Sequence, residues 1–151
     1  MKQPANGASG LEYLVDAYRC DPAALRSSRV LEQVFARIIG DLGLRPVAQP
    51  LWHVFPAPAG ITGLCLLTES HLTIHTFPET GLATINLYCC RPRPAWAWEI
   101  HLADILGAGQ VDVRTVARGQ RLSETSAVQP LPASHARREP ATGFSPTATI
   151  R

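Results

Sequence analysis

The sequence predicts an α/β (α+β) two-layer sandwich, in which a mainly antiparallel sheet carries two helices packed on one face. Three observations predict this class. Short segments of strand composition follow one another through the middle of the chain, with turn residues between them. Two other segments repeat apolar residues every three or four positions, as amphipathic helices do. The order βα, then several strands, then αβ lets both helices cover one sheet.

Six segments are expected to be strands, because β-branched, aromatic or alternating apolar residues dominate them. In chain order they are 11–20, 45–55, 61–69, 71–77, 82–90 and 110–119. Prolines stand at the start of the second segment. The stretches "PAPAG" and "PETG" are expected to be turns that separate neighbouring strands.

The first helical region is expected over 20–43. Asp21 can cap its start, Pro22 suits a first helical position, and Gly43 marks its end. The second helix is expected over 95–108, where tryptophan, leucine and isoleucine recur on one side.

The length of 151 residues fits one domain, and 46% hydrophobic residues can supply a core. We expect this domain over 10–121, a flexible N-terminus over 1–9, and a disordered tail over 122–151, because the tail has few large apolar residues.

The net charge of +2 is too small to indicate a nucleic acid or a membrane surface as partner. No apolar run approaches the roughly 20 residues of a membrane span, and the first ten residues lack the apolar stretch of a secretory signal. We therefore expect a cytoplasmic protein whose cysteines are reduced.

The stretch "LLTESHLTIHTFPET" (66–80) is apolar enough for a buried strand, yet it carries ionisable groups that are costly to bury without a use. A base, His75, follows Ser70 by five residues, and strict alternation puts the two on opposite faces unless the chain bends or breaks. No G-x-S-x-G motif surrounds the serine, so a hydrolase is not indicated. His71 and His75 could share a metal, but further ligands are not evident and no metal is predicted.

Three further residues are candidates on chemical grounds. Cys90 has a thiol whose pKa can move toward neutrality, although most such cysteines only fill space. Cys89 should face away from it, so only one of the two should border a given site. Glu79 could meet a cationic substrate, and Phe55 could attract a cation or stack on a purine.

The run from Phe55 to Cys90 resembles the bacterial and archaeal S-adenosylmethionine decarboxylase proenzymes. The pattern Glu-Ser-His-x-x-x-His-Thr-x-Pro-Glu carries the resemblance, together with "GLEYLVDAYRCD" (10–21) and "ARG" (117–119).

The resemblance implies a zymogen that cuts itself between Glu69 and Ser70. The serine hydroxyl attacks the Glu69 carbonyl to form an ester, His75 removes the serine α-proton, and β-elimination frees a β chain ending at Glu69. Position 70 becomes a covalent pyruvoyl group at the start of an α chain over 70–151. Thr62 stands where the family usually has a serine that assists this step.

The resemblance also implies the reaction. The pyruvoyl group forms a Schiff base with S-adenosylmethionine and acts as an electron sink during decarboxylation, which supplies aminopropyl groups for spermidine. Cys90 matches the proton donor, Glu79 an acid near the substrate, and Phe55 an aromatic that stacks on adenine. A homodimer of cleaved α and β chains is expected.

Two departures from the family pattern leave alternatives open. Asn86 replaces an acid and Arg91 replaces a glycine, and an arginine beside the cysteine suits a carboxylate better than a sulfonium. A pyruvoyl-dependent arginine or ornithine decarboxylase of the same superfamily is one alternative. An uncleaved, non-enzymatic binding or regulatory homologue is the other.

Overall fold

The computed structural model describes residues 10–119, and this range contains three helices and six strands. The elements are β1 (Gly10–Tyr18), α1 (Pro22–Leu25), α2 (Ser28–Asp41), β2 (Leu51–Val54), β3 (Ile61–Leu67), β4 (Ser70–Phe77), β5 (Leu82–Cys89), α3 (Trp98–Leu106) and β6 (Gln110–Arg118). The predicted flexible N-terminus, 1–9, and the predicted disordered tail, 122–151, lie outside the described residues.

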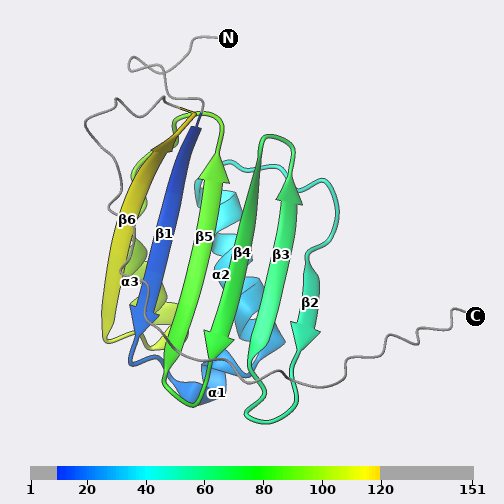
Figure 1. Cartoon of the computed structure of the whole chain (residues 1–151), viewed down its shortest axis with the longest axis vertical. Coiled ribbons are helices and arrows are strands. Elements are labelled where there is room, and N and C mark those ends of the chain that lie inside the picture. The colour runs from blue at the N-terminus through cyan, green and yellow to red at the C-terminus, as the bar shows by residue number, and fades with distance from the viewer. Residues whose placement is uncertain (1–9, 120–151) are drawn as a thin grey trace, which may run out of the picture. The chain divides into compact units, whose positions relative to one another are not determined.

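The six strands form one sheet in the order β2-β3-β4-β5-β1-β6, and every neighbouring pair is antiparallel (Figure 1). β3, β4 and β5 follow one another through tight turns, whereas β1 inserts between β5 and β6. The predicted α+β sandwich with an antiparallel sheet is confirmed.

The helical region expected over 20–43 is divided into α1 and α2. Ser27 has extended dihedral angles, and its hydroxyl accepts a hydrogen bond from the Val30 amide at 3.3 Å. A serine in this conformation starts a new helix instead of continuing the previous one. Asp21 caps α1 as expected, because its carboxylate accepts a bond from the Ala23 amide at 2.8 Å.

The prediction of a strand over 45–55 is wrong for most of its first half. Only Leu51–Val54 pairs as a strand, with one isolated bridge from Pro46 to Leu67. Pro46 and Pro50 have no amide hydrogen to donate to a ladder, so the strand begins after the second proline.

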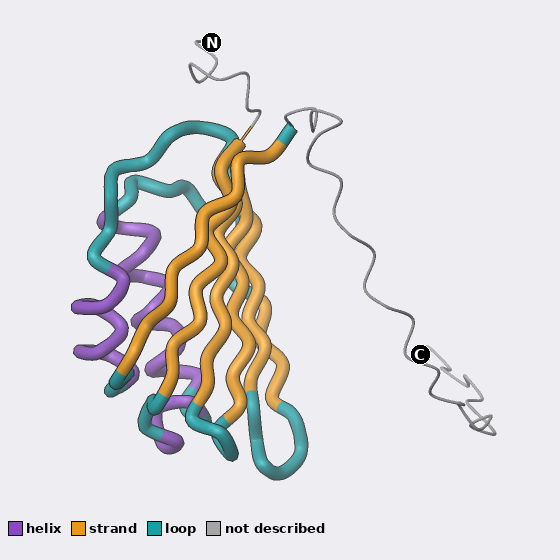
Figure 2. Tube along the Cα trace, turned by 60° about the vertical axis from the view of Figure 1, so that its left-hand side comes forward, coloured by secondary structure: helices purple, strands orange, loops and turns teal. Residues whose placement is uncertain are grey.

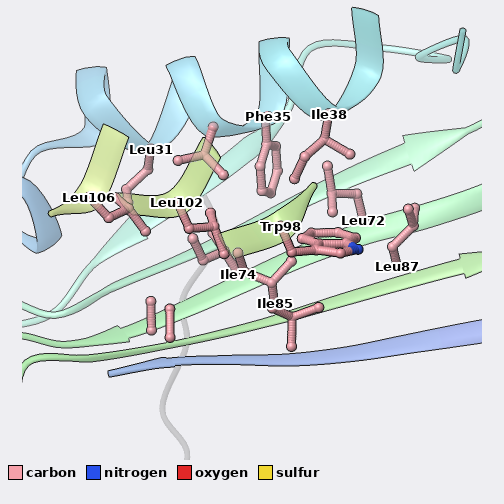
Figure 3. Close-up of a cluster of buried hydrophobic side chains, with 14 of the residues drawn as sticks. Leu31, Phe35, Ile38, Leu72, Ile74, Ile85, Leu87, Trp98, Leu102 and Leu106 are labelled. Atoms are coloured by element: carbon pink, nitrogen blue, oxygen red, sulfur yellow. The ribbon is translucent and has the colours of Figure 1, made fainter. Parts of the chain in front are cut away.

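The helices lie on one side of the sheet, and this side contains the core (Figures 2 and 3). Phe35 of α2 and Leu102 of α3 are at most 1% exposed and face buried side chains of the sheet such as Leu72 and Ile85. Alternation along each strand sends the intervening side chains to the opposite surface, which no described helix covers. We call this surface the open face; it carries Glu12, Thr62, His71, His75 and Asn86.

Candidate active site

The Glu69–Ser70 peptide lies at the tight turn between β3 and β4. Thr68 and Glu69 form the turn, and Leu67 pairs with Ser70 across it. Among the described residues other than glycine, positive φ angles occur at Arg19 and Ala59, and none occurs in this turn. The turn at the Glu69–Ser70 peptide therefore contains no left-handed backbone.

The carbonyl oxygen of Glu69 accepts two hydrogen bonds from Cys90. The thiol Sγ lies 2.8 Å from this oxygen, and the Cys90 amide nitrogen lies 3.3 Å from it. Cys90 follows the last residue of β5, and its side chain is exposed. Two donors on one carbonyl oxygen resemble an oxyanion hole, which stabilises negative charge that develops on that oxygen during attack.

Cys89 also borders the turn, on the helix side of the sheet. It is buried and pairs directly with Ser70 in the ladder between β4 and β5. Burial raises the pKa of the Cys89 thiol, and the neighbouring Arg93 guanidinium and Ser70 hydroxyl act in the opposite direction. The expectation that only one of the two cysteines borders the site is wrong, because Cys89 lies beside the serine and Cys90 contacts the carbonyl.

His75 lies on the open face, near the other end of β4. Its Nδ1 is hydrogen-bonded to the Thr62 hydroxyl on β3 at 2.5 Å. Phe77 and Phe55 flank the imidazole, with ring centroids at 4.6 Å and 5.5 Å. The structure thus brings together Thr62, His75 and Phe55, which are separate candidates in the sequence.

A pocket of about 460 Å³ extends from this histidine. Phe55, His75, Phe77 and Glu79 line it, with the proline-rich loop at 56–58 as one wall. We call it the aromatic pocket. It brings together both residues predicted to bind substrate, and it adds Phe77. Phe77 was missed, although its place two residues after His75 on a strand predicts the same face.

Ser70 and His75 are well separated within one chain. β4 runs without interruption from Ser70 to Phe77, so no bend brings the two residues together. Five strand positions at about 3.3 Å each give roughly 16 Å, and the side chains point to opposite faces. We call the part of β4 that carries Ser70 and the part that carries His75 the two half-sites.

The metal considered for His71 and His75 also conflicts with strand geometry. Four positions separate them on β4, which is about 13 Å, whereas a nitrogen ligand lies about 2 Å from zinc. Within residues 10–119, no group of three histidine, cysteine or acidic side chains could hold a metal ion.

Both departures from the family pattern have local partners. The Arg91 guanidinium lies 2.6 Å from the Glu69 carboxylate, so its charge is paired at the protein surface. Asn86 lies on the open face and donates a hydrogen bond to Glu12 at 2.7 Å. This bond, followed by the contact with Arg118, lowers the pKa of Glu12.

The family model of S-adenosylmethionine decarboxylase matches residues 11–119. A protein of Geobacillus sp. (strain WCH70) named "S-adenosylmethionine decarboxylase proenzyme" is 35% identical over 124 residues, covering 81% of this chain and 97% of its own length. "S-adenosylmethionine decarboxylase proenzyme 2" of Halalkalibacterium halodurans is 37% identical over 112 residues, which is 73% of this chain and 86% of the relative.

A solved structure gives the same result. The crystal structure of the adenosylmethionine decarboxylase from Aquifex aeolicus superposes with a TM-score of 0.64 at 28% identity, covering 78% of this chain and 96% of the other. The chain belongs to the S-adenosylmethionine decarboxylase family. None of the described helices has the length and apolar character of a membrane span.

Proposed function

We propose that this protein decarboxylates S-adenosylmethionine with a pyruvoyl group made from its own Ser70. The observation that carries the proposal is the Glu69 carbonyl held by the Cys90 thiol and amide at the head of β4. The names of its relatives support the substrate and the zymogen character.

The residues around the turn fit such a group. β3 and β4 are each held in the ladder by pairs that continue away from the turn. A cut after Glu69 therefore leaves the sheet paired and places position 70 at a free chain end. The pyruvoyl group there supplies the electron sink for loss of CO₂, and Cys90 and Cys89 hold the position from either side.

The cut uses groups of the chain itself. The Ser70 hydroxyl oxygen bonds to the Glu69 carbonyl carbon, and the two Cys90 donors stabilise the oxyanion. The peptide C–N bond then breaks to leave an ester and a free amine. Removal of the Ser70 α-proton breaks the Cβ–Oγ bond, so Glu69 leaves as a carboxylate with the former serine oxygen. Water hydrolyses the remaining enamine and releases ammonia.

His75 is the base for the α-proton, and we propose that it acts from a second copy of the chain. The His75 of the same chain is roughly 16 Å away along the strand. A homodimer packed through the open face can bring the two half-sites together. On that face Leu64, Leu66 and Val116 are 42%, 59% and 41% exposed, which is apolar surface that a partner would cover.

Thr62 positions this base through a hydrogen bond to Nδ1. When Nδ1–H donates to the Thr62 hydroxyl oxygen, the lone pair of Nε2 is free to accept a proton. A hydroxyl is what this role requires, so threonine serves as well as serine.

The aromatic pocket binds the nucleoside end of the substrate. The faces of Phe55 and Phe77 can stack on adenine and attract the sulfonium, and the Glu79 carboxylate supplies negative charge at the rim.

Cys90, with an exposed thiol, returns a proton to the substrate carbon after CO₂ is lost. Arg91 is paired with Glu69 and gives no support to an arginine or ornithine substrate. Since all four cysteines are free thiols, we place the reaction in the cytoplasm.

Two measurements test the proposal. The intact mass of freshly purified protein should show two chains joined at 69/70, with the second lacking the amine of a normal N-terminus. The cleaved protein should release labelled CO₂ from carboxyl-labelled S-adenosylmethionine. A single chain with an unmodified Ser70, or cleaved protein without CO₂ release, would refute it.

A further inference from the structure

A second pocket lies beside the β3–β4 turn and is lined by arginines. It has a volume of about 240 Å³, and its walls are Gly43, Arg45, Thr68, Glu69, Arg91 and Arg93. We call it the arginine pocket. The Thr68 amide donates to the Arg45 carbonyl at 2.9 Å, so the segment after α2 is fixed to the turn. The pocket is therefore built onto the peptide that we propose is cut.

Positive charge exceeds negative charge in this pocket. Its three guanidinium groups are always protonated, and Glu69 is the one carboxylate among the lining residues. Arg91 lies 2.6 Å and Arg93 3.7 Å from the two oxygens of that carboxylate. The Nε of Arg93 is buried and has no hydrogen-bond partner among the residues that the structure describes. A buried unpaired donor costs free energy unless another acceptor comes to it.

Arg93 is also close to the atoms that react. The Arg93 guanidinium and the Ser70 hydroxyl both act to lower the pKa of the buried Cys89 thiol, and Arg93 lies 3.7 Å from the Glu69 carboxylate. Arg93 thus lies beside Glu69, the residue that takes up the serine oxygen in the proposed cut. In the proposed cut this oxygen leaves position 70 as part of the new Glu69 carboxylate.

We propose that the arginine pocket binds the α-carboxylate created at Glu69, and that Arg93 positions it and promotes the elimination that forms it. This inference rests on the proposed function. The step breaks the Cβ–Oγ bond of the ester at Ser70, its α-proton passes to the base, and both bonding electrons stay on the oxygen. One new negative charge appears beside the arginines, and two carboxylates then face three guanidinium groups.

The physical reason is that arginine binds a carboxylate with paired, charge-assisted hydrogen bonds. Before the cut, the Glu69 carbonyl is neutral and uses the Cys90 donors. After the cut, the same carbon carries an anion, and Arg93 has an unused donor for it. The pocket consequently stabilises the product of cleavage more than the intact chain.

A matched pair of variants tests this role in the full-length protein. Arg93→Gln removes the charge and keeps a polar side chain, whereas Arg93→Lys keeps the charge. Arg37→Ala is the control, because Arg37 is an exposed residue of α2 that pairs with Asp41. The intact mass of each protein is followed with time after synthesis, with and without hydroxylamine, which splits an ester but not a peptide bond.

We expect Arg93→Gln to lengthen the half-time of cleavage at least about tenfold, the usual effect of losing a hydrogen bond to a charged group. Its uncleaved fraction should be split by hydroxylamine, because the ester accumulates. Arg93→Lys should recover most of the rate, and Arg37→Ala should match the unaltered protein.

Cleavage of Arg93→Gln at the unaltered rate would overturn the inference while leaving the proposed function intact. Equal slowing in Arg93→Gln and Arg93→Lys without a hydroxylamine-sensitive ester would also overturn it, because a structural defect slows cleavage without trapping the ester. An unaltered protein that never cleaves would overturn both.

Discussion

Two variants that are each inactive in cleavage should restore it when they are produced together. Ser70→Ala lacks the nucleophile and His75→Ala lacks the base, so neither should be cut on its own. In a mixed dimer, the His75→Ala chain keeps its Ser70, and the Ser70→Ala chain offers the missing histidine. We therefore expect the His75→Ala chain, and not its partner, to be cut.

The size of the effect follows from the separation of the half-sites. Roughly 16 Å of strand divides Ser70 from His75 in one chain, whereas proton transfer needs about 2.6–3.2 Å. His75 therefore cannot reach Ser70 of its own chain unless β4 unfolds. Equal production and random pairing put about half of each variant into mixed dimers, so about half of the His75→Ala chain should be cut.

Tags of different mass on the two variants allow intact-mass spectrometry to assign the fragments. The control is His75→Ala produced with a chain that carries both substitutions, because no histidine is then present at position 75. Absence of cleavage in the mixture of single variants, with dimers of both chains demonstrated, would refute action from a second copy.

Three other predictions concern single side chains. Cys90→Ala should slow both cleavage and CO₂ release by about tenfold or more, since it removes one of two donors to the reacting carbonyl; an unchanged rate in the mass assay would contradict the oxyanion role. Thr76 is buried, and its hydroxyl accepts from the Ile61 amide at 2.8 Å, so Thr76→Val should lower the free energy of unfolding in urea by about 1–3 kcal/mol, and a loss within error would argue against this bond. The hydrogen bond from the Asn86 amide is the main cause that lowers the pKa of Glu12. The Glu12 carboxylate therefore adds stability above its unfolded pKa near 4.5, and this stability is lost as the pH falls through the folded pKa. Glu12→Gln should make the loss of stability below pH 4.5 less steep, and an unchanged loss would show that Glu12 does not contribute to acid unfolding.

Local patterns were sufficient for most of the fold. The alternation of apolar and polar residues predicts β3, β4 and β5 to within two residues, because the core contacts one face of each strand. The predicted boundaries were wrong where a single residue ends or starts an element within an otherwise regular pattern. Ser27 caps a new helix within an otherwise helical sequence, and the prolines at 46 and 50 delay a strand whose other residues suit the sheet.

The candidate site divides in a similar way. The chemical types of Ser70, His75 and Cys90 are visible in the sequence, and so is the alternation that puts the first two on opposite faces. The position of Arg93 is not, because it follows a strand and its contact with Cys89 depends on how the segment after β5 folds back. Phe77 could have been found from its spacing to His75.

The sequence by itself determined the fold class, the family pattern and the set of reacting groups, because hydrophobic periodicity and side-chain chemistry are properties of nearby residues. The tertiary structure alone decided which groups meet. The continuous strand β4 separates the serine from the histidine, the hairpin register sets Cys89 beside the serine, and the segment after β5 brings Arg93 to the turn. These distances depend on pairings between residues far apart in the chain, and a local pattern does not contain them.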